Sequence, residues 1–155
     1  EDAVQAYEMG LAGVVLSNHG GRQLDFARSG VEVLEEVMRE LRKRGSFPNP
    51  AFQVMVDGGF RRGTDILKAL AMGATAVGIG RPFLYAYSAY GVDGVIHAIN
   101  LLRDELEMNM RLIGARSIEE LVPSMVDLSA LHNHTGAVFP KQDQSVLDFM
   151  DKSRL

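Results

Sequence analysis

Short apolar runs alternate along the chain with longer stretches in which apolar residues recur at helical spacing. A short β-branched run bounded by glycine is typical of a buried strand, and the first run predicts a strand covered on both faces. The runs that predict strands are residues 13–16, 52–56 and 76–80. Helical spacing with glycine stops predicts helices at about residues 3–9, 31–43, 64–72 and 93–113.

The predicted order is α-β-α-β-α-β-α, and this alternation is typical of parallel strands joined by helical crossovers. Residues 6–17 and 69–80 repeat one pattern, in which a helix ends at glycine and a strand follows. Beyond Pro123 the periodicity weakens. A chain that begins on a helix and has three predicted strands is typical of the later part of a (β/α)8 barrel, which takes ~250 residues in all. The predicted fold class is therefore α/β, as the C-terminal part of a TIM barrel.

Composition narrows the function classes. The 155 residues carry a net charge of −4 with scattered lysine and arginine, which gives no basic patch for nucleic acid. No apolar run approaches the ~18 residues of a membrane span, so no membrane partner is predicted. Cysteine is absent, which excludes disulfides and cysteine-based zinc sites. Because the chain starts at Glu1 without a signal-peptide pattern, we expect it to begin inside a longer protein.

Glycine and polar residues gather after each predicted strand, where barrel enzymes place their active sites. The second and third clusters put glycine next to arginine, at Gly58, Gly59 and Arg61 and at Gly80 and Arg81. Loops after the last two strands of a barrel often bind phosphate through backbone N–H groups, and arginine adds charged donors. These clusters predict a phosphate site, and the alternative is tight turns with solvated arginines.

The first cluster differs because it places His19 three residues before Arg22. Histidine serves as a general base near neutral pH, and the planar fork of arginine suits a carboxylate. Together they predict a site that binds an acid and removes a proton from the adjacent hydroxyl. The alternative is a structural or surface histidine, because a motif stays a hypothesis until its geometry is known.

Three segments resemble one family. They are SNHGGRQLD at residues 17–25, VDGGFRRGTDILKALAMGA at 56–74 and GIGRPFLYA at 78–86. Together they resemble the FMN-dependent 2-hydroxy acid dehydrogenases, which include glycolate oxidases and flavocytochrome b2 L-lactate dehydrogenases. The likeness covers about residues 1–128, which are therefore expected to be the C-terminal half of the family's barrel, about strands 6–8. Residues 129–155 are then expected to be a C-terminal tail.

The resemblance implies a role for each matching residue. His19 would be the catalytic base that also contacts substrate, and Arg22 the clamp for the substrate carboxylate. FMN would be the cofactor and would accept two electrons from the hydroxy acid. The residues that match the family's flavin-binding positions are Ser17, Asp57, Gly58, Gly59, Arg61, Gly80 and Arg81.

The resemblance also shows which parts of the site this chain does not carry. In the family, the first half of the barrel supplies tyrosines near the substrate, a lysine near the flavin and an aspartate that orients the histidine. We therefore expect no turnover from this chain alone. Three strands also leave open edges and uncovered apolar surface, which favour aggregation or self-association. By resemblance, the whole protein is expected to be a homotetramer.

Several functions stay open at this stage. The leading one is oxidation of a small (S)-2-hydroxy acid, of the glycolate or L-lactate type, with O2 as electron acceptor. A flavocytochrome-type L-lactate dehydrogenase would use cytochrome c and would carry a haem domain upstream. An FMN-barrel isomerase would share the phosphate-side motifs without needing His19 and Arg22 in this arrangement. A truncated, inactive product is the non-enzymatic alternative.

The C-terminal stretch carries two further predictions. Ser153, Arg154 and Leu155 form a variant of the Ser-Lys-Leu peroxisomal address, which favours the peroxisome over the mitochondrial intermembrane space or the cytoplasm. His132 and His134 lack a third ligand at a recognisable spacing, so we predict surface histidines and no metal site.

Overall fold

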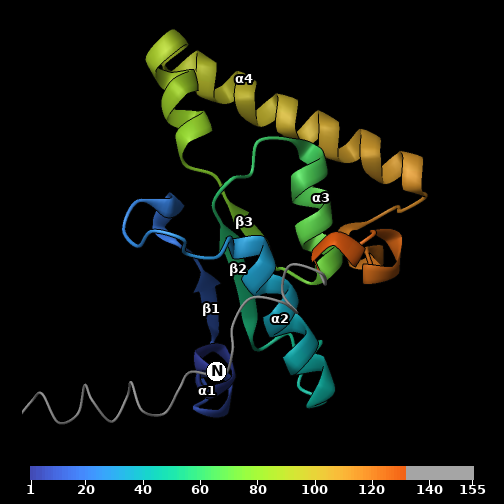
Figure 1. The fold of residues 1–155 in the computed structure, drawn as a ribbon. Coiled ribbons are helices and arrows are strands. Elements are labelled where there is room, and N and C mark those ends of the chain that lie inside the picture. The colour runs from blue at the N-terminus through green and yellow to red at the C-terminus, as the bar shows by residue number, and fades with distance from the viewer. Residues whose placement is uncertain (132–155) are drawn as a thin grey trace, which may run out of the picture.

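The computed structural model describes residues 1–131. The predictions for His132, His134 and the tripeptide 153–155 lie outside the described residues, as does most of the predicted tail. Helices and strands alternate as the sequence predicts (Figure 1). In order, the elements are α1 (Asp2–Glu8), β1 (Gly13–Leu16), α2 (Gly30–Lys43), β2 (Gln53–Asp57), α3 (Gly63–Met72), β3 (Ala76–Gly78) and α4 (Arg81–Ile113). Three 3-10 turns span His19–Gly21, Ile118–Glu120 and Pro123–Met125.

The three strands form one parallel sheet in the order β1-β2-β3. Leu16 is in register with Val56, and Val56 with Val77, so these three side chains share one face. Helices α2 and α3 cover that face, and Val54 and Val56 are fully buried against them. The core side chains that the two helices contribute include Leu34, Met38, Leu41, Ala69 and Met72.

The opposite face of the sheet corrects one prediction. β1 is not buried on both faces, because Val15 is 60% exposed. Val15 is in register with Met55, and Met55 with Ala76, and none of these three side chains is buried. The apolar run therefore belongs to a strand that described helices cover on one side only. Among the described residues, this face leaves apolar side chains in contact with solvent.

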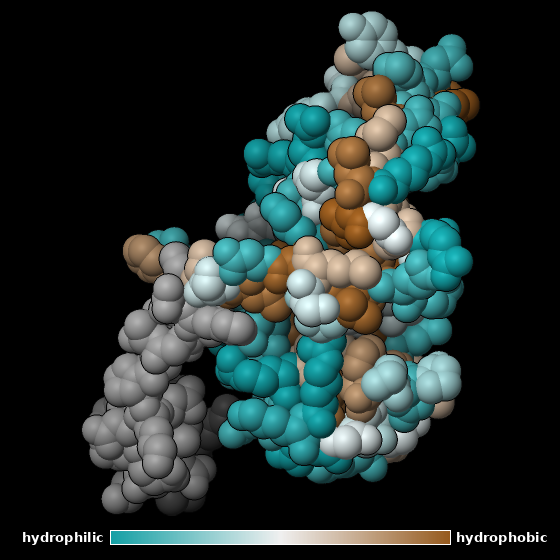
Figure 2. Space-filling model, turned by 90° about the vertical axis from the view of Figure 1, so that its right-hand side faces the viewer, coloured by the Kyte–Doolittle hydropathy of each residue, from teal (hydrophilic) through white to brown (hydrophobic). Residues whose placement is uncertain are grey.

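The last helix differs most from its prediction. α4 begins at Arg81 and not near residue 93, and it breaks at Gly91, whose φ of 61° and ψ of −146° are not helical. The first segment gave no helical pattern because large apolar side chains lie on its exposed sides, including Leu84, Tyr85, Tyr87 and Tyr90. Figure 2 shows apolar patches at the height of α4 among hydrophilic neighbours.

The second segment of α4 packs on α3. Leu106 and Met110 lie against Leu67 and Ala71 in a second apolar cluster. The contact is close, because a Cβ on Gly63 would lie 2.5 Å from Cβ of Glu105 and would overlap the backbone nitrogen of Leu106. No described helix is long and apolar enough to cross a bilayer.

Candidate functional site

The carboxyl ends of the three strands meet at one edge of the sheet, and the loops that follow them surround an open pocket of about 690 Å³. This volume is in the range of cofactor and ligand sites. Eight of the nine residues predicted from the sequence line it: His19, Arg22, Asp57, Gly58, Gly59, Arg61, Gly80 and Arg81. Apolar side chains that were not predicted complete the lining: Phe60, Ile79, Pro82, Leu84 and Tyr85.

Ser17 is the predicted residue that does not line this pocket. Its hydroxyl instead accepts a hydrogen bond from the backbone N–H of His19 at 3.1 Å. The role of Ser17 as a flavin contact therefore stays a prediction, and its visible role is within the loop.

The loop after β1 has a left-handed backbone. His19, Gly20 and Gly21 have φ values of 55°, 65° and 72°. Glycine adopts this conformation freely, whereas a histidine pays a steric cost of about 1–2 kcal/mol. Strain of this kind collects at functional sites, where the surrounding structure fixes it. The turn is closed by a hydrogen bond from Gly21 N–H to the carbonyl of Asn18 at 3.1 Å.

The loop after β2 obtains its left-handed backbone from glycine alone. Gly58 and Gly59 have φ values of 89° and 88°, and a Cβ on Gly59 would meet nothing within 4 Å. A ligand can therefore approach the backbone here. The carboxylate of Asp65 in α3 fixes the far side of the loop, because its Oδ2 accepts hydrogen bonds of 3.0 Å from the N–H groups of Arg61 and Arg62.

Asp57 carries an unsatisfied acceptor beside this loop. Its Oδ1 is buried and has no hydrogen-bond partner among the described residues. A buried carboxylate oxygen without a donor is costly, so a donor from a ligand or from further protein is expected there. Glycine at position 78 makes room for this side chain, because a Cβ there would lie 2.9 Å from Cβ of Asp57.

Arg81 connects the third loop to the first. Its Nη2 donates to the carbonyl of Gly20 at 3.0 Å. A guanidinium has five N–H donors, so this bond leaves donors for a ligand. Gly80 precedes it at the N-cap of α4, and a Cβ there would also meet open space.

The pocket concentrates unpaired positive charge. Within residues 1–131, no ion pair involves Arg22, Arg61 or Arg81, although all three line the pocket. The arginines that do form ion pairs lie elsewhere: Arg28, Arg39, Arg44, Arg62, Arg103, Arg111 and Arg116. Three arginines that line one pocket without an acidic partner in the described part of the chain favour an anionic ligand there.

Arg62 shows how the chain separates two adjacent arginines. Arg61 lines the pocket, whereas Arg62 does not, and the Nη2 of Arg62 pairs with Oε1 of Glu105 at 2.7 Å. The hydrogen bond between them raises the pKa of Arg62 and lowers the pKa of Glu105, and the N–H of Gly63 lowers the Glu105 pKa further. Arg62 is thus a structural cation that ties the second loop to α4.

Sequence reasoning missed Asn18 and Glu105, which hold the loops. Asn18 had a usable signal, because asparagine before a glycine-rich turn often bonds the backbone ahead of it. Glu105 had none, since its partner is 43 positions away in the sequence. No group of three or more His, Cys, Asp or Glu residues that could hold a metal occurs among the described residues.

The model of the family described as FMN-dependent dehydrogenase matches residues 1–128. The chain belongs to the FMN-dependent dehydrogenase family. An L-lactate dehydrogenase (cytochrome) from Wickerhamomyces anomalus is 60% identical over 133 residues, which are 86% of this chain and 23% of that protein. A peroxisomal (S)-2-hydroxyacid oxidase from Arabidopsis thaliana is 48% identical over 126 residues, which are 81% of this chain and 33% of that protein.

A solved structure of this FMN-dependent family is also similar. A double mutant of flavocytochrome b2 with pyruvate bound is 56% identical, with a TM-score of 0.81 over 90% of this chain and 36% of that chain. The chain thus spans 23% to 33% of the length of these two curated relatives. The family's dependence on FMN agrees with the cofactor that the sequence resemblance implied.

Proposed function

We propose that this chain is the C-terminal part of a (β/α)8 barrel, with strands 6–8 of that barrel in β1, β2 and β3. The order of the strands supports this, because it follows the sequence without reversal. The helices support it too, since α2 and α3 cover the same face of the sheet. A doubly wound sheet would have helices on both faces and a point of reversal. The open face at Val15, Met55 and Ala76 is then the barrel interior. In this division residues 1–128 carry the site and 129–155 form a tail.

The pocket fits FMN. Arg61 and Arg81, with the open backbone at Gly58, Gly59 and Gly80, suit the dianionic phosphate. Asp57 does not suit phosphate, because a carboxylate repels it. Its unpartnered Oδ1 needs a donor, which a hydroxyl group of the ribityl chain would supply. When bound, FMN would accept the two electrons and the hydrogen that leave the hydroxyl-bearing carbon of the substrate.

The function that the site supports best is oxidation of a small (S)-2-hydroxy acid to the 2-oxo acid. Arg22 binds the substrate carboxylate through two parallel N–H donors. His19 accepts the proton of the substrate hydroxyl at an imidazole nitrogen. Both act from one short turn, so the carboxylate and the hydroxyl of a 2-hydroxy acid, which sit on adjacent carbons, are held together.

Relatives favour L-lactate with a cytochrome acceptor over oxidation by O2. Identity is 60% to the L-lactate dehydrogenase (cytochrome) and 48% to the peroxisomal oxidase. The peroxisomal address at residues 153–155 favours the oxidase, and the name of the Arabidopsis relative is consistent with it. The whole protein is proposed to be a homo-oligomer, which would cover exposed apolar side chains of α4.

The observation that carries this proposal is the single pocket that collects His19, Arg22 and the glycine–arginine loops. The test places residues 1–128 in the Wickerhamomyces enzyme in place of the segment they match, which gives a complete barrel. L-lactate, glycolate and L-mandelate are then added without oxygen, and loss of the visible flavin absorbance is followed. We expect one of these acids to reduce the flavin. In His19→Ala and Arg22→Ala the rate of flavin reduction should fall by about 10²-fold or more, because the base or the carboxylate clamp is lost.

His97→Ala and Arg103→Ala are the matched controls, because both residues are exposed on α4 and neither lines the pocket. They should reduce the flavin at the unsubstituted rate. A flavin that binds but that none of the acids reduces would contradict the proposal and favour the isomerase. The chain alone should bind FMN weakly, and none of the three acids should reduce the flavin that it binds.

A further inference from the structure

The turn that carries His19 is strained and short, so something must hold it. Histidine in the left-handed region is uncommon, and release to a negative φ would turn the side chains of His19 and Arg22 in new directions. The Arg81 bond to Gly20 restrains the middle of the turn. It does not fix the residue from which the turn starts.

The side chain of Asn18 connects that turn to the residue before the N-cap of α2. Its Oδ1 accepts a hydrogen bond of 3.1 Å from Gly21 N–H, which the backbone carbonyl of Asn18 also accepts, so the side chain caps the turn from His19 to Gly21. Its Nδ2 donates to the backbone carbonyl of Arg28 at 3.1 Å, ten residues ahead. A carboxamide has a donor and an acceptor on one plane, and both are used here.

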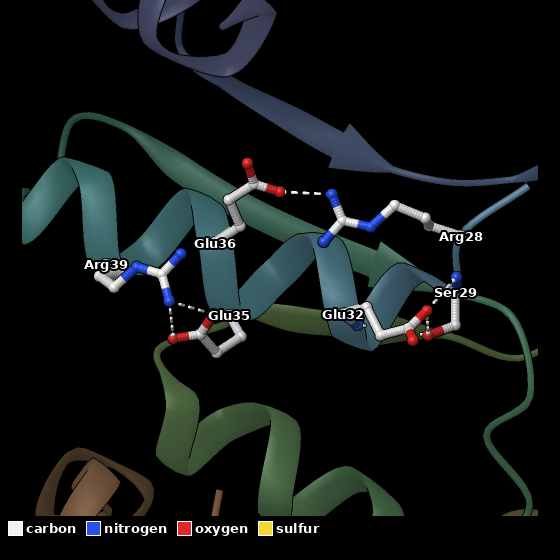
Figure 3. A network of polar contacts seen from close by, with 6 residues as sticks. All are labelled: Arg28, Ser29, Glu32, Glu35, Glu36 and Arg39. Atoms are coloured by element: carbon white, nitrogen blue, oxygen red, sulfur yellow. Dashed lines mark hydrogen bonds and ion pairs between the residues drawn. The ribbon is translucent and has the colours of Figure 1, made fainter. Parts of the chain in front are cut away.

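The second of these bonds reaches a rigid part of the fold. Arg28 directly precedes Ser29, the N-cap of α2, whose side chain and that of Glu32 form a reciprocal capping box. Figure 3 shows this start of α2, with Glu36 one turn along the helix reaching back to the guanidinium of Arg28. The helix start also presses on the sheet, because a Cβ on Gly30 would lie 2.5 Å from the carbonyl oxygen of Asp57.

We propose that Asn18 is a positioning residue for catalysis, which ties the angle of His19 and Arg22 to the start of α2. The inference rests on the proposed function. Asn18 does not line the pocket, so it acts through the turn and not on the substrate. A misplacement of about 1 Å in an active site costs on the order of 10²-fold in rate. The two hydrogen bonds offset the strain that the turn stores at His19.

The test compares Asn18→Ala with Asn49→Ala in the complete barrel described above. Asn49 is a close match, because its Oδ1 accepts from Ala51 N–H at 2.9 Å and its Nδ2 donates to the Tyr7 hydroxyl at 3.5 Å. It lies in the loop before β2, at the other end of the strands. Each variant thus loses two side-chain hydrogen bonds. Only the substitution at Asn18 lies beside the catalytic turn.

We expect Asn18→Ala to lower kcat for L-lactate and to raise KM, each by tenfold or more, because His19 and Arg22 move together. Asn49→Ala should leave both constants within twofold at a similar loss of thermal stability. Asn18→Asp keeps the acceptor for Gly21 and loses the donor, so its kcat should fall between the two. Hydrogen exchange at the Gly21 amide should speed up in Asn18→Ala and not in Asn49→Ala.

Failure of this inference and failure of the proposed function give different results. Equal kcat and KM in Asn18→Ala and Asn49→Ala, with an active unsubstituted protein, would overturn the role of Asn18 alone. An unsubstituted protein that reduces its flavin with none of the acids would overturn the proposed function and the catalytic half of this inference together. Unchanged Gly21 exchange in Asn18→Ala would overturn the structural half.

Discussion

The loops after β1 and β2 solve one backbone problem in two ways. Both leave the carboxyl ends of neighbouring parallel strands, and both pass through left-handed backbone beside the pocket. The second loop places only glycines there, Gly58 and Gly59, whereas the first places His19 ahead of its two glycines. The first loop therefore stores strain that the second avoids.

This difference follows what each loop offers a ligand. The second loop offers backbone, and glycine gives a close approach without steric cost. The first loop offers an imidazole, so it needs a residue that disfavours the conformation. The first loop is held by the neutral carboxamide of Asn18 and by the guanidinium of Arg81, whereas the second loop is held by the carboxylates of Asp65 and Glu105. The loop after β1, which carries the proposed base, thus differs from the loop after β2, which offers its backbone to a ligand, in backbone strain and in the charge of its anchoring side chains.

The anchoring of the second loop on α4 gives the largest expected effect on stability. Gly63→Ala puts a methyl group against the backbone of Leu106 and Cβ of Glu105, where only a shift of α4 makes room. Overpacking of this kind costs about 3 kcal/mol. Urea unfolding should show this loss in the free energy of unfolding. Gly45→Ala is the control, because its added Cβ meets nothing within 4 Å. Its φ of 68° adds a backbone strain that Gly63 does not have, so the control overstates the cost of the methyl group alone. A smaller loss in Gly63→Ala than in Gly45→Ala would mean that the two helices do not lock the loop.

The carboxylate that anchors the second loop should contribute more to the free energy of unfolding than the helix cap that follows the first loop. Asp65→Ala removes two charge-assisted hydrogen bonds, to Arg61 and Arg62, and should cost about 2 kcal/mol. Ser29→Ala removes the N-cap acceptor of α2 and should cost about 1 kcal/mol. Urea unfolding of both variants measures the difference. Equal losses would show that the two loops are anchored with similar strength.

Periodic patterns of apolar residues predict most helices and strands, whereas features that depend on single contacts leave no such pattern. Helical spacing in α2 and the apolar runs of β1 and β2 predict the order of the fold, because burial on one face imposes a period. The apolar run of β1 overstated the burial of Val15, because a run of apolar residues does not reveal whether both faces of a strand are covered. Helical spacing missed residues 81–90 as a helix because Tyr85 and its apolar neighbours replace the polar face that makes a helix recognisable.

Most of the candidate site came from the order of motifs after strands, since parallel strands bring their carboxyl ends to one edge. The left-handed turn at His19 had no signal in residue type, because histidine disfavours it. The bonds of Asn18 to nearby backbone obey no period. The pairing of Arg62 with Glu105 depends on how α3 and α4 pack, which no local pattern encodes.

Moving strain between the two loops should have opposite effects on stability. His19→Gly relieves the left-handed residue and should raise the free energy of unfolding by about 1 kcal/mol, while it abolishes reduction of the flavin. Gly59→Ala introduces the same strain in the second loop and should lower the free energy of unfolding by about 1 kcal/mol. Thermal unfolding of the two variants, with His19→Ala for reference, separates strain from loss of the imidazole. A His19→Gly protein no more stable than His19→Ala would remove strain as the feature that distinguishes the loops.

The smallest expected effect is a dependence on pH that only the second loop should show. The pKa of Glu105 is lowered from its ordinary value of 4.5, first by the hydrogen bond from Arg62 and then by that from Gly63 N–H. A carboxyl whose pKa is lower in the folded state stabilises the fold above its unfolded pKa, and this contribution is lost as the pH falls through the folded value. The raised pKa of Arg62 adds no dependence in this range, because the guanidinium stays charged on both sides of it.

Glu105→Gln should therefore be less stable than the unsubstituted protein at neutral pH, and the difference between their unfolding midpoints should shrink as the pH falls below 4.5. The effect is small because Arg62 is largely exposed and solvent screens the pair. The matched change in the first loop, Asn18→Ala, removes a neutral anchor, so its destabilisation should be the same at both ends of this pH range. If the two differences followed the same course with pH, the charge of the anchors would not distinguish the loops, and strain at His19 alone would remain to do so.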